Sequence, residues 1–141
     1  MVAGMTLREM FVKTALDRRT GAEDRARKAA LAYVDTFGNG DIDARLALFA
    51  PEASFEDPVG TPPITGHAAL RAFWEQGAAL GVAITVEHIA ANAGSAAMLF
   101  TARLTAAGSA PVAMRVIEIV EVDESGLIVR MHAYFDETSI V

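Results

Sequence analysis

The spacing of hydrophobic residues divides the chain into a helical first part and a β-rich second part. Apolar side chains recur every three or four positions in four stretches, which predicts helices near 7–17, 22–37, 42–49 and 66–80. Apolar and polar side chains alternate in later stretches, which predicts strands over 52–57, 82–91, 96–107, 112–122 and 127–136. Thr6 and Asp41 have the side chains of helix N-caps, and Gly38-Asn39-Gly40 ends the second predicted helix.

This order of elements indicates the fold class. Helices that precede strands joined by short turns are typical of an α+β protein with an antiparallel meander. The chain has 141 residues, which favours a single domain, and it contains no internal repeat. The meander has two apolar faces and the helices cover one of them. We therefore expect the other face to pair with a second subunit in a homodimer.

Composition narrows the class of protein further. Hydrophobic residues make up 52% of the chain and the mean hydropathy is +0.30, an apolar excess that a cavity or a subunit interface would take up. The net charge is −6 and basic residues are scattered among acidic ones, so no nucleic-acid partner is expected. The start of the chain lacks a secretory signal, and no apolar run approaches about 18 residues. We therefore expect a cytoplasmic protein without a membrane segment.

The sequence offers no metal or cofactor site. There is no cysteine, which excludes disulfides, thiolate nucleophiles and cysteine-ligated metals. His67, His88 and His132 lack the spacing of metal ligands. The chain also lacks a phosphate-binding loop and a Gly-x-Ser-x-Gly elbow. The expected chemistry therefore uses neither metal nor cofactor.

Three polar residues stand where the pattern calls for apolar ones. Glu118 interrupts an apolar strand face that otherwise consists of Met114, Val116, Val120 and Val122. Tyr33 lies on the inward stripe of the second predicted helix, and Asp57 shares a strand face with Phe55. A buried glutamate favours its neutral form, which can donate a hydrogen bond. One phenol and two carboxyl groups that meet in an apolar pocket can move a proton beside a carbonyl group.

Each of the three residues also has an ordinary structural explanation. Glu118 could pair with Arg103 or Arg130, or lie at the rim of a pocket. A core tyrosine such as Tyr33 commonly donates to a backbone carbonyl. Asp57 precedes a proline, and Asp-Pro is a common turn dipeptide. Taken singly, these residues do not decide between a structural role and a catalytic one.

Longer motifs carry a resemblance to a known family. Four segments matter, namely Gly40-Asp41-Ile42-Asp43, Leu48-Phe49-Ala50, Phe55-Glu56-Asp57-Pro58-Val59-Gly60 and Asp123-Glu124-Ser125-Gly126. With the spacing to Tyr33 and Glu118, they make the chain resemble the bacterial Δ5-3-ketosteroid isomerases of the NTF2-like (SnoaL-like) superfamily. The resemblance implies a cone-shaped, curved antiparallel sheet wrapped on N-terminal helices, as in cystatin-like folds. It places this domain at residues 22–141 and leaves 1–21 as an N-terminal helical extension.

The resemblance also implies a role for each polar residue. Asp57 matches the base that carries a proton from C4 to C6 of the steroid, and Tyr33 matches the tyrosine of the oxyanion hole. Glu118 falls where the family has a protonated aspartic acid as the second oxyanion donor. The chain departs from the family in having glutamate at 118. It also has Phe49 and Trp74 where some members have tyrosines that support the oxyanion tyrosine.

The expected ligand is a hydrophobic small molecule, such as a steroid-like ketone. Apolar residues expected to line its pocket are Phe49, Phe55, Val59, Phe73, Trp74, Met98, Phe100, Met114, Val116, Val120, Met131 and Phe135. Two alternatives stay open at this point. One is a SnoaL-like polyketide cyclase, which also needs a carboxylate base and a site that stabilises an enolate. The other is a non-catalytic binding or dimerisation module with the same fold.

Overall fold

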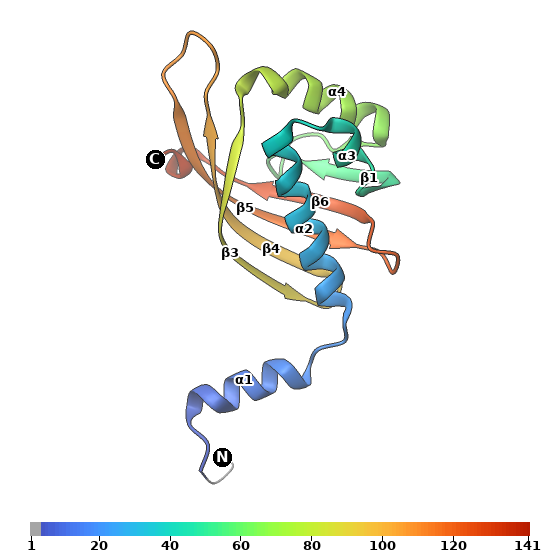
Figure 1. The fold of residues 1–141 in the computed structure, drawn as a ribbon, viewed down its shortest axis with the longest axis vertical. Helices are drawn as coiled ribbons and strands as arrows, with labels where there is room; N and C mark the ends of the chain where they lie inside the picture. Colours follow the sequence, from blue (N-terminus) through green and yellow to red (C-terminus); the bar gives the residue numbers. More distant parts are fainter. Residues whose placement is uncertain (1–3) are drawn as a thin grey trace.

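The computed structural model describes residues 4–141 as one curved sheet with most of its helices on one side and the first helix apart from it (Figure 1). The helices are α1 (Leu7–Asp17), α2 (Ala22–Asn39), α3 (Ile42–Leu46) and α4 (His67–Gly77), with short 3₁₀ turns η1 (Ala78–Leu80) and η2 (Glu137–Ser139). The strands are β1 (Phe49–Glu56), β2 (Ile64–Thr65), β3 (Ala83–Asn92), β4 (Ser95–Leu104), β5 (Val112–Val122) and β6 (Ile128–Tyr134). The predicted α+β class is therefore confirmed.

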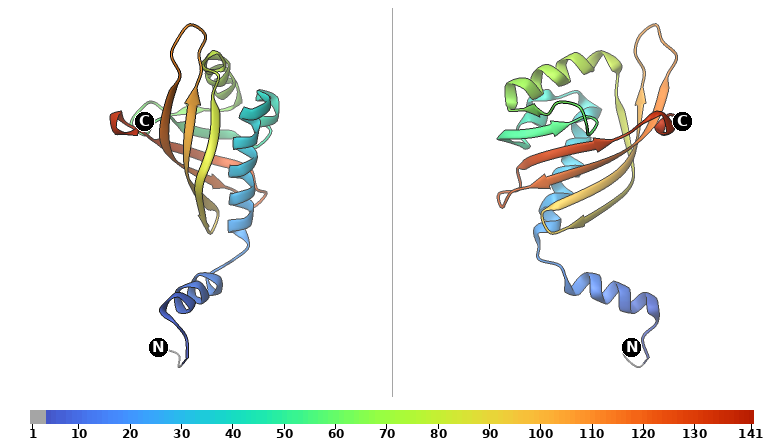
Figure 2. Two further views of the ribbon diagram at one scale, coloured as in Figure 1. Left: turned by 60° about the vertical axis from the view of Figure 1, so that its left-hand side comes forward. Right: turned by 180° about the vertical axis from the view of Figure 1, so that it is seen from behind.

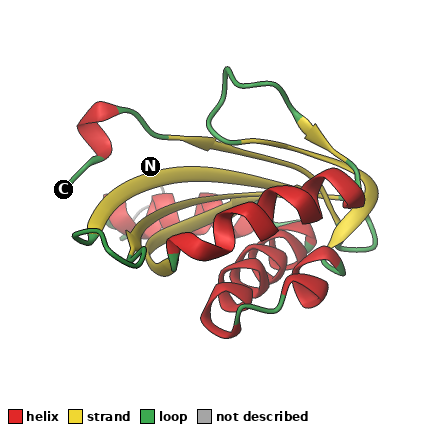
Figure 3. Ribbon diagram, turned by 90° about the horizontal axis from the view of Figure 1, so that it is seen from above, coloured by secondary structure: helices red, strands yellow, loops and turns green. Residues whose placement is uncertain are grey.

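The sheet contains six strands in the order β2-β1-β6-β5-β4-β3. Strands β3 to β6 form the predicted antiparallel meander, but β1 pairs with β6 in parallel. The sheet is therefore mixed rather than wholly antiparallel. All elements from β2 to β5 lie between β1 and β6 in the chain, and this long connection allows the two strands to run in the same direction. Register shifts near Glu87 and between Glu121 and Val122 mark bulges, which increase the local twist. Seen from above, the sheet curves around the helices on one side (Figure 3).

Helix α2 supplies the apolar surface that faces the sheet, and it packs across β3, β4 and β5. Its buried side includes Ala26, Ala30 and Tyr33, and small residues there let the helix approach the strands closely. The helix stops at Gly40, which adopts the left-handed conformation (φ 65°) that glycine tolerates best. Asp41 then caps α3 by accepting a hydrogen bond from the backbone N–H of Ala44 at 2.9 Å. Both cap predictions are confirmed in this region.

Helix α1 stands apart from the rest of the protein (Figure 2). Thr6 caps it in a reciprocal capping box with Glu9, as its side chain predicted. None of its residues is buried, and Leu7 and Phe11 are 66% and 69% exposed. The first three residues of the expected extension, 1–3, lie outside the described residues. No helix within residues 4–141 combines the length and the apolar character needed to cross a membrane.

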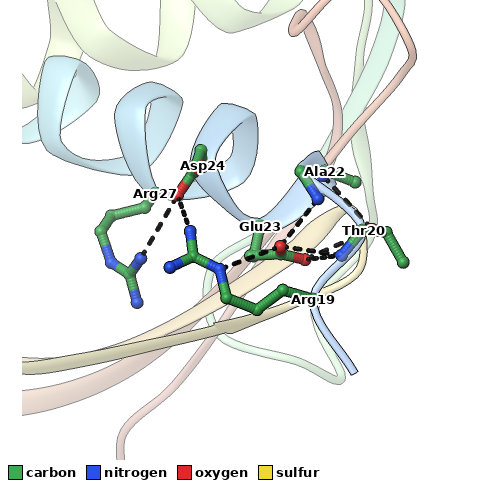
Figure 4. A network of polar contacts seen from close by, with 7 residues as sticks. Arg19, Thr20, Ala22, Glu23, Asp24 and Arg27 are labelled. Atoms are coloured by element: carbon green, nitrogen blue, oxygen red, sulfur yellow. Dashed lines mark hydrogen bonds and ion pairs between the residues drawn. The ribbon is translucent and has the colours of Figure 1, made fainter. Parts of the chain in front are cut away.

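The junction between α1 and α2 is fixed by hydrogen bonds to the Glu23 carboxylate (Figure 4). This carboxylate accepts from the backbone N–H groups of Thr20 and Gly21 at 2.9 and 2.8 Å. These bonds, led by the one from Gly21, lower the pKa of Glu23 to about 2. Arg19 bonds to Asp24 across the same junction. These bonds therefore fix the backbone at the start of α2.

Several element boundaries differ from the prediction. Helix α2 runs to Asn39 rather than 37, and the strands predicted over 96–107 and 127–136 end at Leu104 and Tyr134. Phe49 begins β1 rather than ending α3, and β1 starts three residues before the expected strand at 52. The two-residue strand β2 was not predicted. The fourth predicted helix divides into α4 and the 3₁₀ turn η1. Pro51 lies inside β1 but has no partner on β2, because β2 pairs only with Ser54 and Phe55. The N–H group that proline lacks is therefore not needed for a hydrogen bond to β2.

Candidate active site

Two acidic side chains approach each other across three neighbouring strands. Glu118 on β5 pairs with Ala133 on β6. On the other side of β6, Glu56 of β1 pairs with His132, so the next residue, Asp57, lies beside Ala133. The backbone N–H of Val59, two residues after Asp57, donates to the Ala133 carbonyl oxygen at 2.8 Å, which keeps this segment beside β6. Ala133 itself is fully buried and carries only a methyl side chain.

Tyr33 approaches this region from the helical side, on the buried stripe of α2. Its ring packs edge-on against Phe37 and Phe49, with centroids 5.1 and 6.0 Å away. Such contacts fix the plane of the ring and so the direction of its hydroxyl group. Trp74 of α4 lies on another side of the same ring at 6.3 Å. An aromatic cluster thus holds the phenol in one orientation.

A cavity of about 390 Å³ brings the three polar residues together. Tyr33, Asp57 and Glu118 all line it, and most of the rest of its wall is apolar. The cavity lies between the inner face of the sheet and the helices. Its volume falls within the range of small-molecule sites, about 300–1,000 Å³. The described side chains therefore do not fill the space that the expected ligand would occupy.

Glu118 is buried without a charged partner. It is 3% exposed, and its Oε1 atom has no hydrogen-bond partner among residues 4–141. Arg130 pairs instead with Glu56 and Glu121, and Arg103 is exposed. Burial, followed by the negative charge of Asp57, raises the pKa of Glu118 to about 8. At neutral pH this carboxyl group is mostly protonated and can donate a hydrogen bond into the cavity.

At neutral pH the Asp57 carboxyl group is mostly ionised, whereas the Tyr33 phenol is neutral. Partial burial raises the pKa of Asp57 to about 6, so this carboxyl group is mostly ionised at pH 7. Burial, then the nearby Glu118, raises the pKa of the Tyr33 phenol well above its usual value of 10. The site thus combines one carboxylate that can accept a proton with two neutral groups that can donate hydrogen bonds. Such a divergence of pKa values among neighbouring groups is typical of acid–base sites.

Seven of the twelve apolar residues expected to line the pocket do so. These are Phe55, Phe73, Trp74, Phe100, Met114, Val116 and Phe135. The other five do not line this cavity. Phe49, Met98, Val120 and Met131 face inward but are buried in the core, where other side chains cover them. Val59 is 38% exposed and lies at a separate shallow depression beside Pro58.

Arg45 is the main feature of the cavity wall that the sequence analysis missed. It lines the cavity and is only 4% exposed, although arginine is normally a surface residue. Its position three residues after Ile42 places it on the inward side of α3, a signal that was available in the sequence. Phe37, Ile84 and Leu104 also line the cavity. They are ordinary apolar residues whose periodicity predicted burial but not contact with a cavity.

Trp74 lies beside Tyr33, and its ring centroid is 6.3 Å from that of Tyr33. Its buried indole N–H lies close enough to lower the pKa of the Tyr33 phenol. The geometry nevertheless falls short of a hydrogen bond, and the indole nitrogen has no partner among residues 4–141. An indole N–H only donates, so the phenol remains free to donate its own proton elsewhere. Within the described residues, no group of three or more histidine, aspartate or glutamate side chains is placed to hold a metal ion.

Comparisons with known proteins identify relatives that are enzymes. The steroid Δ-isomerase of Nocardioides simplex is 36% identical over 110 residues, which cover 77% of this chain and 88% of that protein. The epoxide hydrolase LasB of Streptomyces lasalocidi is 36% identical over 124 residues, or 83% of this chain. Those residues make up 43% of LasB, so the chain spans less than half of that relative.

Solved structures share the fold. The epoxide hydrolase/cyclase-like enzyme SalBIII, which acts in pyran ring formation in the polyether salinomycin, has a TM-score of 0.78 and 25% identity. That match covers 84% of this chain and 95% of SalBIII. RV0760c from Mycobacterium tuberculosis, solved in complex with estradiol-17β-hemisuccinate, has a TM-score of 0.77 and 23% identity, covering 83% of this chain and 98% of that one.

The family itself is identified by a match over most of the domain. The SnoaL-like domain family matches residues 30–131, a range that contains Tyr33, Asp57 and Glu118. The predicted resemblance to steroid isomerases is confirmed by the relative from Nocardioides simplex. The chain belongs to the SnoaL-like domain family, and its relatives include a steroid isomerase and epoxide hydrolase or cyclase-like enzymes.

Proposed function

We propose that the protein is a cofactor-independent isomerase that converts a Δ5-3-ketosteroid into the conjugated Δ4-3-ketosteroid. One observation carries the proposal. An ionised Asp57, a neutral Glu118 and a neutral Tyr33 line one apolar cavity, and their pKa values diverge in the sense that proton transfer needs. The steroid isomerase relative, which aligns over most of its own length, supports the same reaction.

The reaction needs one proton to move and no other reactant. The Asp57 carboxylate removes a proton from C4, the carbon between the ketone and the double bond, and the electron pair forms a dienolate. Tyr33 and Glu118 donate hydrogen bonds to the enolate oxygen as its charge develops. The protonated Asp57 then returns the proton to C6, which shifts the double bond into conjugation. The substrate is isomerised and every residue regains its first state.

The surroundings of the two donors favour this reaction. An apolar cavity excludes water and strengthens hydrogen bonds to the enolate oxygen. One such donor is worth about 10²–10³ in kcat. Glutamate at 118 has one methylene more than the aspartic acid of the family, so its acid group reaches further from the sheet.

The direct test follows conjugated-enone absorbance after the protein is mixed with a Δ5-3-ketosteroid. The wild type is expected to raise the absorbance well above the Asp57→Asn variant. Asp17→Asn on α1 serves as a matched control, because it removes the same charge from an exposed position outside the cavity. If the wild type and Asp57→Asn give the same rate, the steroid isomerase proposal is wrong.

A second candidate is an epoxide hydrolase or cyclase, and the relatives LasB and SalBIII favour it. A neutral Glu118 could protonate the epoxide oxygen while Asp57 activates a water molecule or a substrate hydroxyl group. Incubation with a hydroxy-epoxide, followed by mass spectrometry and NMR, separates the outcomes. Turnover of the epoxide without isomerisation of the ketosteroid would favour this candidate, and a SnoaL-like polyketide cyclase would respond to neither substrate.

The non-catalytic alternative made a structural prediction about Glu118. It required an ionised Glu118 paired with arginine and a cavity filled by side chains, and neither feature is present among residues 4–141.

Homodimer formation stays a prediction. The outer face of the sheet exposes Ile117 and Tyr134, which are register partners on β5 and β6 and are 51% and 47% exposed. Light scattering on the purified protein would measure its mass in solution.

A further inference from the structure

Arg45 is a buried cation that the proposed isomerisation does not use. Its side chain lines the same cavity as Tyr33 and Glu118 and is 4% exposed. Removing a guanidinium group from water is costly unless it gains a charged or hydrogen-bonding partner. A buried arginine on a cavity wall therefore raises the question of which group neutralises it.

Residues of α2 hold the guanidinium in a fixed orientation. Its Nε donates to Thr36 Oγ1 at 2.9 Å and its Nη2 to the Thr36 carbonyl oxygen at 3.3 Å. The Thr36 hydroxyl in turn donates to the carbonyl oxygen of Tyr33 at 2.6 Å. The guanidinium also stacks over the Phe37 ring, 3.7 Å from its centroid. Trp74 lies 5.1 Å away on another side.

The protein leaves most of this guanidinium unpaired. It has five N–H donors, and two of them serve Thr36. The other three have no acceptor among residues 4–141, and no carboxylate lies within 4.0 Å of Arg45. The charged or titratable groups that act on it are Tyr33 and Asp41, and burial lowers its pKa. Arginine stays protonated despite such a shift.

A purely structural role explains only part of this arrangement. The bond to the Thr36 carbonyl ties α3 to the last turn of α2, whose final carbonyls lack partners within the helix. That role uses one edge of the guanidinium. The remaining N–H groups belong to a planar fork that matches the two oxygens of a carboxylate.

We propose that Arg45 binds a carboxylate group of the ligand, so that the substrate of this cavity is an apolar ketone that also carries a carboxylate. The choice of a ketone as the substrate rests on the proposed function, whereas the carboxylate is inferred from Arg45. Charge also orients the ligand. The ionised Asp57 repels a carboxylate, whereas Arg45 attracts it, and within residues 4–141 no ion pair joins Arg45 to Asp57 or Glu118. The carboxylate therefore lies at the Arg45 side of the cavity.

The test compares ligands that carry a carboxylate with counterparts that lack one. Two pairs serve, 2-naphthol with 6-hydroxy-2-naphthoic acid, and estradiol with estradiol-17β-hemisuccinate. Trp74 is the only tryptophan and lines the cavity, so its fluorescence reports binding. In the wild type at pH 7, we expect the carboxylate member of at least one pair to bind about tenfold more tightly than the neutral member. Arg45→Gln is expected to abolish that preference, and Arg45→Lys to keep part of it.

The ratio of the two affinities separates ligand binding from a structural role. If Arg45 only supports the fold, Arg45→Gln weakens both members of a pair by the same factor, and the inference is overturned. It is also overturned if the wild type prefers the neutral member in both pairs. Arg103→Gln is the matched control, since Arg103 is exposed and lies outside the cavity. Because the readout is binding, absence of isomerase activity would count against the proposed function and not against this result.

Discussion

Replacing Glu118 by glutamine is expected to stabilise the protein by an amount that grows with pH. In the folded protein, burial raises the pKa of this carboxyl group from its ordinary value of 4.5 to about 8. Between these two values the unfolded chain binds fewer protons than the folded one. The free energy of unfolding of the wild type therefore falls as pH rises through this window. Glutamine has the same shape and does not titrate, so the variant lacks this loss.

The size of the effect follows from the displaced pKa. Each pH unit between the two pKa values costs the wild type about 1.4 kcal/mol. Ionisation of the unfolded chain begins near 4.5, so the cost reaches about 3 kcal/mol at pH 7 and levels off above about pH 8. The free energy of unfolding of Glu118→Gln minus that of the wild type should therefore rise by about 1.4 kcal/mol per pH unit from about pH 5 to 8. Any constant difference in packing leaves this slope unchanged.

Urea denaturation of both proteins at several pH values measures the difference directly. The contributions of most other titrating groups cancel in the difference between the two free energies of unfolding, because both proteins contain these groups. Glu124→Gln, in the exposed turn before β6, controls for the loss of one negative charge. A difference between Glu118→Gln and the wild type that is the same at pH 5 and pH 8 would show that Glu118 ionises normally, and the reasoning about its neutral form would be refuted.

Three further outcomes are expected. The profile of kcat/KM against pH should be bell-shaped, rising through a pKa of about 6 as Asp57 ionises and falling through about 8 as Glu118 ionises; a flat profile would contradict these roles. Tyr33→Phe should lower kcat on a Δ5-3-ketosteroid by about 10²–10³, whereas an unchanged kcat would remove Tyr33 from the site. Deletion of residues 1–18 should change the free energy of unfolding by less than about 1 kcal/mol in urea denaturation, because α1 buries nothing, and a larger loss would mean that α1 packs on another surface.

Local periodicity predicted those parts of the fold that depend on one packed face. The alternation along β5 correctly assigned Val116, Glu118 and Val120 to the inner face, since one face of that strand packs on the core. The inward stripe of α2 was correct for the same reason. These patterns also brought Tyr33 and Glu118 to attention as polar residues at buried positions. Their catalytic roles remain predictions.

Pairing between distant segments was harder to predict. The parallel contact of β1 with β6 joins residues more than 70 positions apart, and no local pattern encodes it. Alternation predicted β1 over 52–57, three residues later than it begins. The irregular register between Phe49 and Ser54 lets the strand begin earlier. Its partner β2 is too short to produce a periodic signal.

Which side chains line the cavity depends on which inward-facing residues of the sheet are covered by a helix. Met98 and Val120 face the same side of the sheet as Glu118, but they are buried in the core and do not line the cavity. Periodicity places a residue on a face and says nothing about what lies above it. Arg45 was missed because a charged residue is expected at the surface, although its place on α3 faces inward.

The central claim is that Tyr33 and a neutral Glu118 donate hydrogen bonds to the same point in the cavity, within reach of an ionised Asp57. A crystal structure with a bound steroid phenol tests it most directly, because the phenol oxygen imitates the enolate oxygen. We predict that this oxygen lies about 3 Å from both the Tyr33 hydroxyl and the Glu118 carboxyl group, with Asp57 above the ring. A phenol bound elsewhere, or a Glu118 side chain turned away from it, would contradict the proposed site.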